Sequence, residues 1–81
     1  IGVQEVIVIA DALKSSTVLT ELNLSGNHRI GPAGVLALAE MLKVNTTLTK
    51  LGLSSCGVGD EGVRHLVAVL QVVEELDLGR N

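Results

Sequence analysis

Leu19 to Leu42 reads LTELNLSGNHRIGPAGVLALAEML, and Leu48 to Leu70 repeats it almost unchanged as LTKLGLSSCGVGDEGVRHLVAVL. A third, shorter copy begins at Val73 with VEELDL. Self-similarity at a spacing of about 20 to 50 residues is typical of proteins that stack one small structural unit. The chain is therefore predicted to form one repeat domain over residues 1–81, with a leading helix (1–18), two repeats (19–47 and 48–72) and a trailing strand (73–81).

Two hydrophobic spacings alternate within each copy. Leu22 and Leu24 alternate with polar residues, as in a strand with one buried face. Farther along each copy, apolar residues recur at the three- and four-residue spacing of an amphipathic helix. These helical stripes are Val6, Ile9, Ala10 and Leu13; Val35, Leu38, Ala39 and Leu42; and Val63, Leu66, Val67 and Leu70. Because the links are short, the strands are predicted to be parallel, with the helices as crossovers.

The succession L-T-E-L-N-L-S-G-N, I-G-P-A-G and an apolar helix resembles the leucine-rich repeat, and the longer unit resembles its ribonuclease-inhibitor-like subtype. The resemblance covers the whole chain. It implies an α/β solenoid, a fragment of a horseshoe, with parallel strands on the concave side and helices on the convex side. Since such a unit does not bury its apolar face alone, flanking repeats of a longer parent chain are expected on both sides.

Three departures interrupt the repeat. Glu5 stands where the other two copies have glycine, so the first helix is expected to begin differently or to be truncated. The stretch with His28 and Arg29 is one residue longer than its counterpart, which predicts a bulged loop. Between Gln71 and Glu74 the third copy lacks a counterpart of residues 45–47. Either the deletion is real or three residues are missing from the sequence.

Composition argues against several classes of partner. Six basic and nine acidic residues give a net charge of −3, and the basic residues are dispersed, so no surface for nucleic acid is predicted. Aromatic residues for stacking bases are absent. No apolar run reaches the length of a membrane span. The single cysteine excludes an internal disulfide and indicates a reducing, cytoplasmic location.

No catalytic, cofactor or metal site is predicted. Cys56 stands at the position of Asn27, and the resemblance implies that this position bonds the loop backbone, so a buried structural thiol is expected rather than a nucleophile. His28 and His65 do not have the spacing of metal ligands. The Gly-x-x-Gly elements lack the lysine of a phosphate-binding loop and are interpreted as tight turns. No Ser–His–Asp arrangement is present, and the protein is predicted not to be an enzyme.

The outward strand positions are the predicted interaction site. With the leucines turned inward, three rows of mostly polar residues run across the strands, and a basic or mixed-charge protein surface would complement them. The alternative is a solvated face that contacts nothing, in a segment that only spaces other domains. The candidate partner-binding residues are Glu21, Asn23, Ser25, Lys50, Gly52, Ser54, Glu75 and Asp77, and Gly79 completes the third row.

A second candidate surface lies on the helices. Ile7 and Leu36 occupy a position that the repeat places outward, where the third copy has Arg64. Two stacked apolar residues would form a small exposed patch for a partner. Alternatively, flanking parts of a longer protein cover them.

The sequence thus favours a noncatalytic protein–protein interaction module that binds its partner on the concave polar face. By resemblance, related proteins are intracellular inhibitors, innate-immune sensor domains, GTPase activators and actin-filament cappers, and the segments around Leu13 and Lys43 also resemble repeats of tropomodulin and leiomodin. The alternative is a GTPase-activating or actin-binding regulatory domain. Asn27 and Arg29 are the nearest candidates for a GTPase-activating role.

Overall fold

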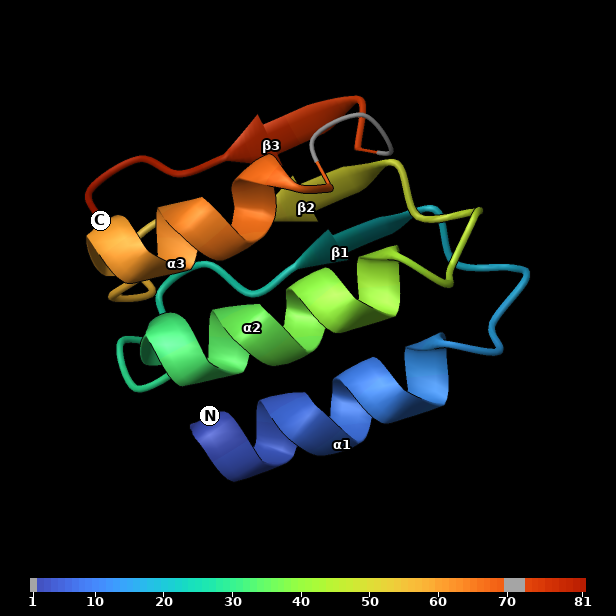
Figure 1. Ribbon diagram of the computed structural model, residues 1–81, viewed down its shortest axis with the longest axis horizontal. Coiled ribbons are helices and arrows are strands. Elements are labelled where there is room, and N and C mark those ends of the chain that lie inside the picture. Colours follow the sequence, from blue (N-terminus) through green and yellow to red (C-terminus); the bar gives the residue numbers. More distant parts are fainter. Residues whose placement is uncertain (1, 70–72) are drawn as a thin grey trace.

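The computed structural model describes residues 2–69 and 73–81 of the chain. Helices and strands alternate along these residues in the predicted order (Figure 1). The elements are α1 (Val3–Leu13), β1 (Glu21–Asn23), α2 (Gly31–Leu42), β2 (Lys50–Gly52), α3 (Gly59–Val67) and β3 (Glu75–Asp77). Pro32 lies in the first turn of α2, where its missing N–H has no helical partner to lose.

The strands form one parallel sheet in the order β1-β2-β3, as the short crossovers predicted. Its register pairs Leu22 with Leu51 and Leu51 with Leu76, so equivalent residues of the three copies lie side by side. The helices form a second layer over one face of this sheet, with α2 between α1 and α3 (Figure 1). The other face, called here the open sheet face, is covered by no helix of the described residues.

The core between the two layers is aliphatic. Leucine, valine, isoleucine, alanine, one methionine and Cys56 fill it, with Leu38, Leu51 and Leu53 among the fully buried side chains. The second glycine of each Gly-x-x-Gly element belongs to this packing. A Cβ on Gly34 would lie 2.6 Å from Cγ2 of Ile30, and one on Gly62 would lie 2.6 Å from Cγ1 of Val58. These elements therefore act as packed turns that lead from strand to helix.

The predicted buried stripe of the third helix is wrong in part. Val35 and Val63 are equivalent in the repeat, but their exposed fractions are 0% and 42%. Ala39 and Val67 differ in the same way, at 1% and 59%. The reason is that these positions face the next helix along the chain: α2 covers those of α1 and α3 covers those of α2, whereas within the described residues no helix follows α3. Leu70 lies outside the described residues.

The sheet shows the same effect at its edges. Leu51 and Leu53 of the central strand are buried, whereas the predicted inward residues Leu22, Leu76 and Leu78 are only half-buried. Within the described residues, β1 and β3 each have one neighbouring strand, and this leaves Leu22, Leu76 and Leu78 partly open.

The departures from the repeat have local consequences. α1 begins at Val3, one position after the glycine of the repeat, and Glu5 Oε1 accepts a hydrogen bond of 2.8 Å from the Gly2 N–H. With 11 residues against 12 in α2 and 9 in α3, α1 is not truncated. The loop of residues 24–30 is one residue longer than its counterpart at 53–58. The question of a deletion between Gln71 and Glu74 falls on residues 71 and 72, outside the described part of the chain.

Candidate interaction site on the open sheet face

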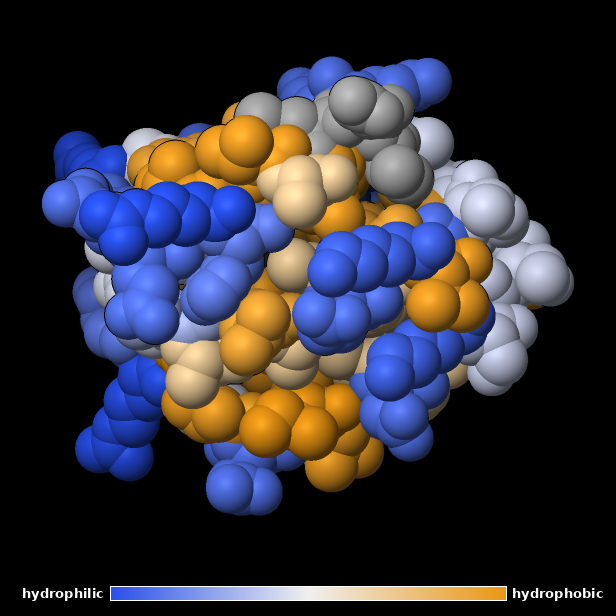
Figure 2. All heavy atoms as spheres, viewed as in Figure 1, coloured by the Kyte–Doolittle hydropathy of each residue, from blue (hydrophilic) through white to orange (hydrophobic). Residues whose placement is uncertain are grey.

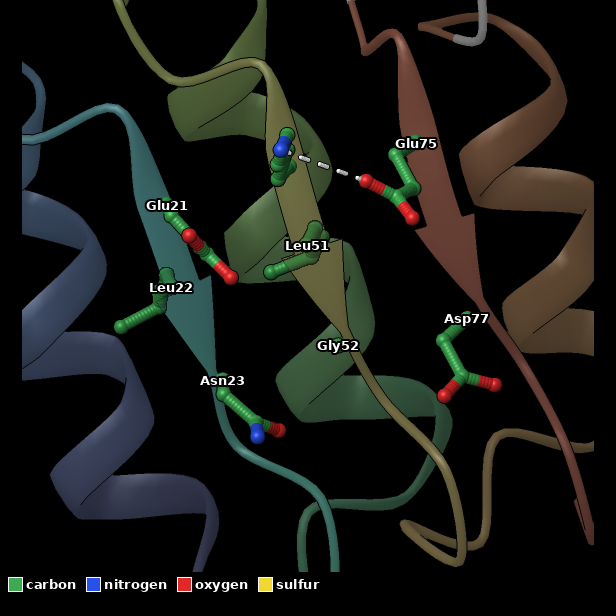
Figure 3. A pocket seen from close by; sticks show the side chains of 8 residues that line it. Glu21, Leu22, Asn23, Leu51, Gly52, Glu75 and Asp77 are labelled. Atoms are coloured by element: carbon green, nitrogen blue, oxygen red, sulfur yellow. Dashed lines mark ion pairs between the residues drawn. The ribbon is translucent and has the colours of Figure 1, made fainter.

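The strand register assembles the predicted rows of outward residues. Glu21 pairs with Lys50, and Lys50 with Glu75, so one row carries two carboxylates around an ammonium group. Lys50 Nζ lies 3.6 Å from Glu75 Oε2, the ion pair drawn in Figure 3. Both side chains are exposed, and an exposed pair of this kind stabilises the fold by only about 0 to 1 kcal/mol. These charges therefore remain available to a partner.

A shallow hollow of about 170 Å³ lies on this face, at the centre of the sheet. Side chains of β1 and β3 flank it, and the floor is at Gly52 of β2 (Figure 3). Because Gly52 has no side chain, the surface dips between Asn23 and Asp77. The lining residues are Glu21, Leu22, Asn23, Lys50, Leu51, Gly52, Glu75 and Asp77.

The two polar side chains that flank Gly52 are held by the turns that follow their strands. Asn23 Oδ1 accepts a hydrogen bond of 3.0 Å from the Ser25 N–H. Asp77 Oδ1 accepts one of the same length from the Gly79 N–H. Each side chain thus keeps its orientation without a partner, which lowers the entropy lost when a partner binds.

Ser25 and Ser54 serve a different purpose from the other candidates. The Ser54 N–H donates to Ser25 Oγ at 3.1 Å, and Ser54 Oγ donates to the Gly79 carbonyl at 2.8 Å. These bonds join the three successive turns beyond the strands. Neither serine lines the hollow, so the structure brings six of the eight predicted residues together and places these two beside them.

Leu22 and Leu51 are the lining residues that sequence reasoning left out. Both were assigned to the core because they alternate with polar residues, yet parts of both border the hollow. An alternating pattern assigns a side chain to one face only and does not show that its backbone and Cβ border the other. The sequence therefore held no signal for their part in the site.

Cys56 is buried, as expected. Its Sγ donates to the Leu24 carbonyl at 3.0 Å, and its N–H donates to Asn81 Oδ1 at 2.8 Å. Asn27, at the same position of the first copy, donates from Nδ2 to the Leu24 carbonyl at 2.7 Å. These side chains bond loop backbone within and between copies, so Cys56 and the asparagines are structural.

Asn45 was not recognised from the sequence. It is a buried polar residue in the turn after α2, and its Nδ2 donates to the Leu13 carbonyl at 2.6 Å. Its Oδ1 accepts hydrogen bonds of 2.8 Å from the N–H groups of both Thr47 and Leu48. Asn45 thereby joins the α2–β2 turn to the end of α1, at the opposite end of the repeat from Cys56.

The remaining candidate features are the two histidines, Arg29 and the helices. His28 is exposed in the β1–α2 loop, and His65 is half-buried on α3. Residues 2–69 and 73–81 contain no group of three or more His, Cys, Asp or Glu placed to hold a metal ion. Arg29 is exposed, pairs with Gly2 in an isolated β-bridge and borders a loop hollow together with Asn27. The Asn27 Nδ2 group donates to the Leu24 carbonyl. None of the helices described is long and apolar enough to cross a membrane.

Comparison with known proteins identifies the repeat. The family model of the leucine-rich repeat matches residues 15–39 and 44–67, together more than half of the chain. Neither the curated proteins nor the solved structures give a match. Leucine-rich repeats generally mediate protein–protein interactions and are typically noncatalytic. With its parallel sheet, its helix layer and this match, the chain belongs to the leucine-rich repeat family.

Proposed function

We propose that this leucine-rich repeat protein is a noncatalytic module that binds another protein through the open sheet face. The observation that carries the proposal is the hollow at Gly52, to which all three strands contribute. Its rim holds three carboxylates, from Glu21, Glu75 and Asp77, and one ammonium group, from Lys50. Opposite charge on a partner speeds encounter and selects against wrong partners. A basic or mixed-charge protein surface is therefore the partner that fits.

The geometry supports a rigid mode of recognition. Asn23 and Asp77 are fixed by their own turns, and the serine bonds hold the turns of successive copies together. Because Gly52 has no side chain, a protruding side chain of the partner reaches the strand backbone between these two residues. Preorganised groups lose little entropy on binding, so small changes of charge at this rim are expected to alter affinity measurably.

The proposal extends to a ribonuclease-inhibitor-like horseshoe in which the open sheet face is concave, with flanking repeats packed on this segment. Its support is the exposure of Val63 and Val67, because in α1 and α2 the equivalent residues are buried by the next helix. It also includes a cytoplasmic location, consistent with a single cysteine, Cys56, which is buried. No cofactor enters this function.

The experiment begins with affinity capture and identification of the bound protein, followed by titration of that purified partner. The test variant is Glu21→Gln with Asp77→Asn, which removes two charges and keeps the shapes. Its matched control is Glu61→Gln with Asp60→Asn, which removes two exposed charges from the first turn of α3. The test variant is expected to bind at least tenfold more weakly, and the control within about twofold of the unmodified chain; tenfold corresponds to about 1.4 kcal/mol.

Two outcomes would contradict the proposal. Equal affinity of the test variant and the control would remove the open sheet face as the binding site. A partner that survives Glu21→Lys, Glu75→Lys and Asp77→Lys together would point instead to a spacer role for this sheet. If the captured protein is a GTPase or actin, the same variants decide whether the open sheet face is the surface it uses.

A further inference from the structure

An apolar groove lies between α1 and α2 on the outer side of the helix layer. Figure 2 shows hydrophobic surface gathered over these helices, in the view of Figure 1. Ile7, Val8 and Leu36 have exposed fractions of 44%, 69% and 41%. The groove has a volume of about 490 Å³ and is lined by Ile7, Val8, Ala10, Asp11, Lys14, Ala33, Leu36, Ala37 and Glu40.

The repeat itself does not require this groove. At the position that is Ile7 in α1 and Leu36 in α2, α3 carries Arg64, and at the position of Ala37 it carries His65. The outer surface between α2 and α3 is therefore charged where that between α1 and α2 is apolar. An apolar pair at a position that the same fold fills with arginine does not serve the core. Exposing this apolar pair to water is unfavourable, and exposed apolar patches of this kind are typical of contact surfaces.

The backbone of the groove decides which kind of segment fits it. Helical residues in the middle of α1 and α2 bond their N–H and C=O groups within the helix. An extended segment laid in the groove would lose water from its own backbone and find no backbone partner, at a cost of roughly 1–3 kcal/mol for each buried polar group. A helix satisfies its backbone internally. A helical segment therefore fits this groove better than an extended one.

The shape of the groove agrees with this occupant. Alanines at positions 10, 33 and 37 line it together with the larger Ile7 and Leu36, and small side chains let a helix approach closely. The lining runs from Ile7 to Lys14 along α1 and from Ala33 to Glu40 along α2, so the groove extends for about two helical turns. Two turns accommodate apolar residues at positions i, i+3 or i+4, and i+7 of an amphipathic helix.

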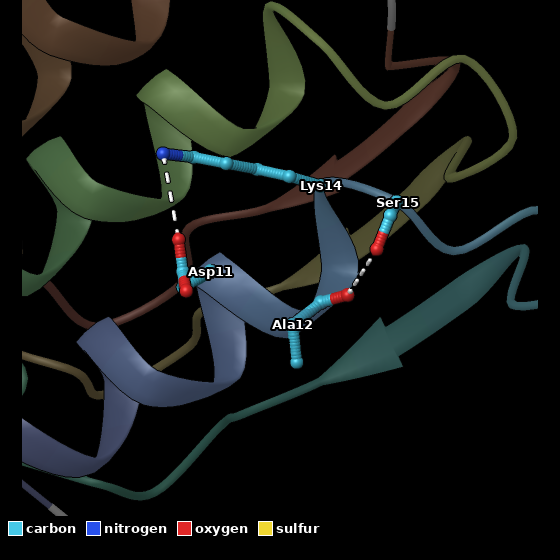
Figure 4. Close-up of polar contacts among 4 residues, drawn as sticks. All are labelled: Asp11, Ala12, Lys14 and Ser15. Carbon is cyan, nitrogen blue, oxygen red and sulfur yellow. Dashed lines mark hydrogen bonds and ion pairs between the residues drawn. The ribbon is translucent and has the colours of Figure 1, made fainter.

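Charge at one end of the groove separates a protein helix from a membrane surface. Asp11 Oδ1 lies 3.9 Å from Lys14 Nζ, as Figure 4 shows, and Glu40 Oε1 lies 3.3 Å from Lys43 Nζ. Both signs are thus balanced around the C-terminal ends of α1 and α2. An anionic lipid surface attracts an excess of basic residues, which this rim lacks. We propose that the groove binds an amphipathic helix of another protein, independently of the open sheet face.

The test uses two displayed peptide libraries, one on a stable single-helix scaffold with one randomised face and one of unstructured peptides. The unmodified chain is expected to enrich helices that carry an apolar stripe, and the best is then titrated by fluorescence anisotropy. Leu36→Lys and Ile7→Lys are each expected to weaken binding at least tenfold. Val63→Lys, which changes an equally exposed valine on α3, is the matched control and is expected to leave binding within about twofold.

Lysine at these positions is compatible with folding, since the third copy carries Arg64 there, and urea denaturation of each variant confirms it. The proposal is overturned if the helical library yields no binder, if the lysine variants bind as well as Val63→Lys, or if the unstructured library yields the tighter binders. A dimer in sedimentation equilibrium that Ile7→Lys dissociates would also overturn it, because a second copy would then fill the groove. Binding to phosphatidylserine vesicles that Leu36→Lys abolishes would overturn it in favour of a lipid surface.

Discussion

Asn23 lies close beside Gly52 at the edge of the hollow: a Cβ on Gly52 would lie 2.7 Å from Asn23 Oδ1 and 3.2 Å from Ser25 Oγ. Glycine at this position therefore has two consequences. It keeps the hollow open for a partner, and it lets Asn23 keep its hydrogen bond to the Ser25 N–H. The open hollow and the hydrogen bond in the turn beside it both depend on the absence of a Cβ at residue 52.

Gly52→Ala is expected to displace the Asn23 side chain and break the Ser25 N–H to Asn23 Oδ1 hydrogen bond, with a loss of about 1 kcal/mol in the free energy of unfolding. Asn23→Ala removes the same bond beforehand, so Gly52→Ala should cost clearly less in that background, where the 3.2 Å contact with Ser25 Oγ remains. Urea denaturation of both single variants and the double variant measures this coupling. Additive effects of the two substitutions would show that the side chains do not compete for this space.

Asn45→Ala is expected to lower the free energy of unfolding by about 2 to 4 kcal/mol. The variant leaves the N–H groups of Thr47 and Leu48 and the Leu13 carbonyl without their side-chain partner, in surroundings that are largely buried. Chemical denaturation measures the loss. Thr46→Ala, at the exposed neighbouring position, is the control and should stay within about 0.5 kcal/mol. A loss below 1 kcal/mol for Asn45→Ala would contradict its role as a link between copies.

Periodicity in the sequence was sufficient to predict the order of elements, the parallel sheet and the rows of the open sheet face. Equivalent residues of stacked copies must pair, so aligning Glu21 with Lys50 and Glu75 was already a prediction of their register. The exposure of Ile7 and Leu36 followed from the same alignment, because the repeat fixes the direction in which each helical side chain points.

Contacts between copies were not predictable in the same way. Asn45 bonds a residue 32 positions earlier, and an asparagine before two threonines has the sequence of an ordinary turn. Likewise, the spacing of Val63 and Val67 is typical of buried residues, but they are exposed. Their burial would require a neighbouring helix, and the spacing of residues within one helix gives no information on its neighbours. The hydroxyl of Ser54 was assigned to the surface, whereas the fold uses it to bond the next turn.

The Cys56 thiol is expected to resist alkylation in the folded protein. Its Sγ is buried and donates to the Leu24 carbonyl, so iodoacetamide reaches it only when the chain opens, and the thiolate is the reactive form. The labelling rate, followed by mass spectrometry, should rise with urea in parallel with unfolding. Full reactivity in 6 M urea is the positive control. Rapid labelling without denaturant would contradict the structural role of this thiol.

Val35→Ala and Val63→Ala make the same chemical change at equivalent positions of α2 and α3. Val35 is fully buried between helices, and its truncation is expected to cost about 2 kcal/mol, counting about 0.8 kcal/mol for each methyl group plus the cavity. Val63 is exposed, so its truncation should cost less than about 0.5 kcal/mol. Thermal and urea denaturation of the two variants test the difference. Equal losses would mean that another element covers Val63 in solution.

Ser55→Gly is expected to raise the free energy of unfolding by about 0.5 to 1 kcal/mol. Ser55 has φ of 56°, at the position where the first copy has Gly26 with φ of 87°. A left-handed backbone costs a residue with a Cβ about 1–2 kcal/mol, and the greater freedom of glycine in the unfolded chain offsets part of the gain. The bond from the Ser55 N–H to the Gly79 carbonyl, 2.9 Å long, is backbone and is kept. The reciprocal variant is Gly26→Ala, and no atom lies within 4 Å of the methyl group that it adds. Its expected loss of about 1 kcal/mol in the free energy of unfolding therefore comes from backbone conformation alone. If Ser55→Gly lowers stability in urea denaturation, the serine hydroxyl contributes more than the strain of its backbone costs.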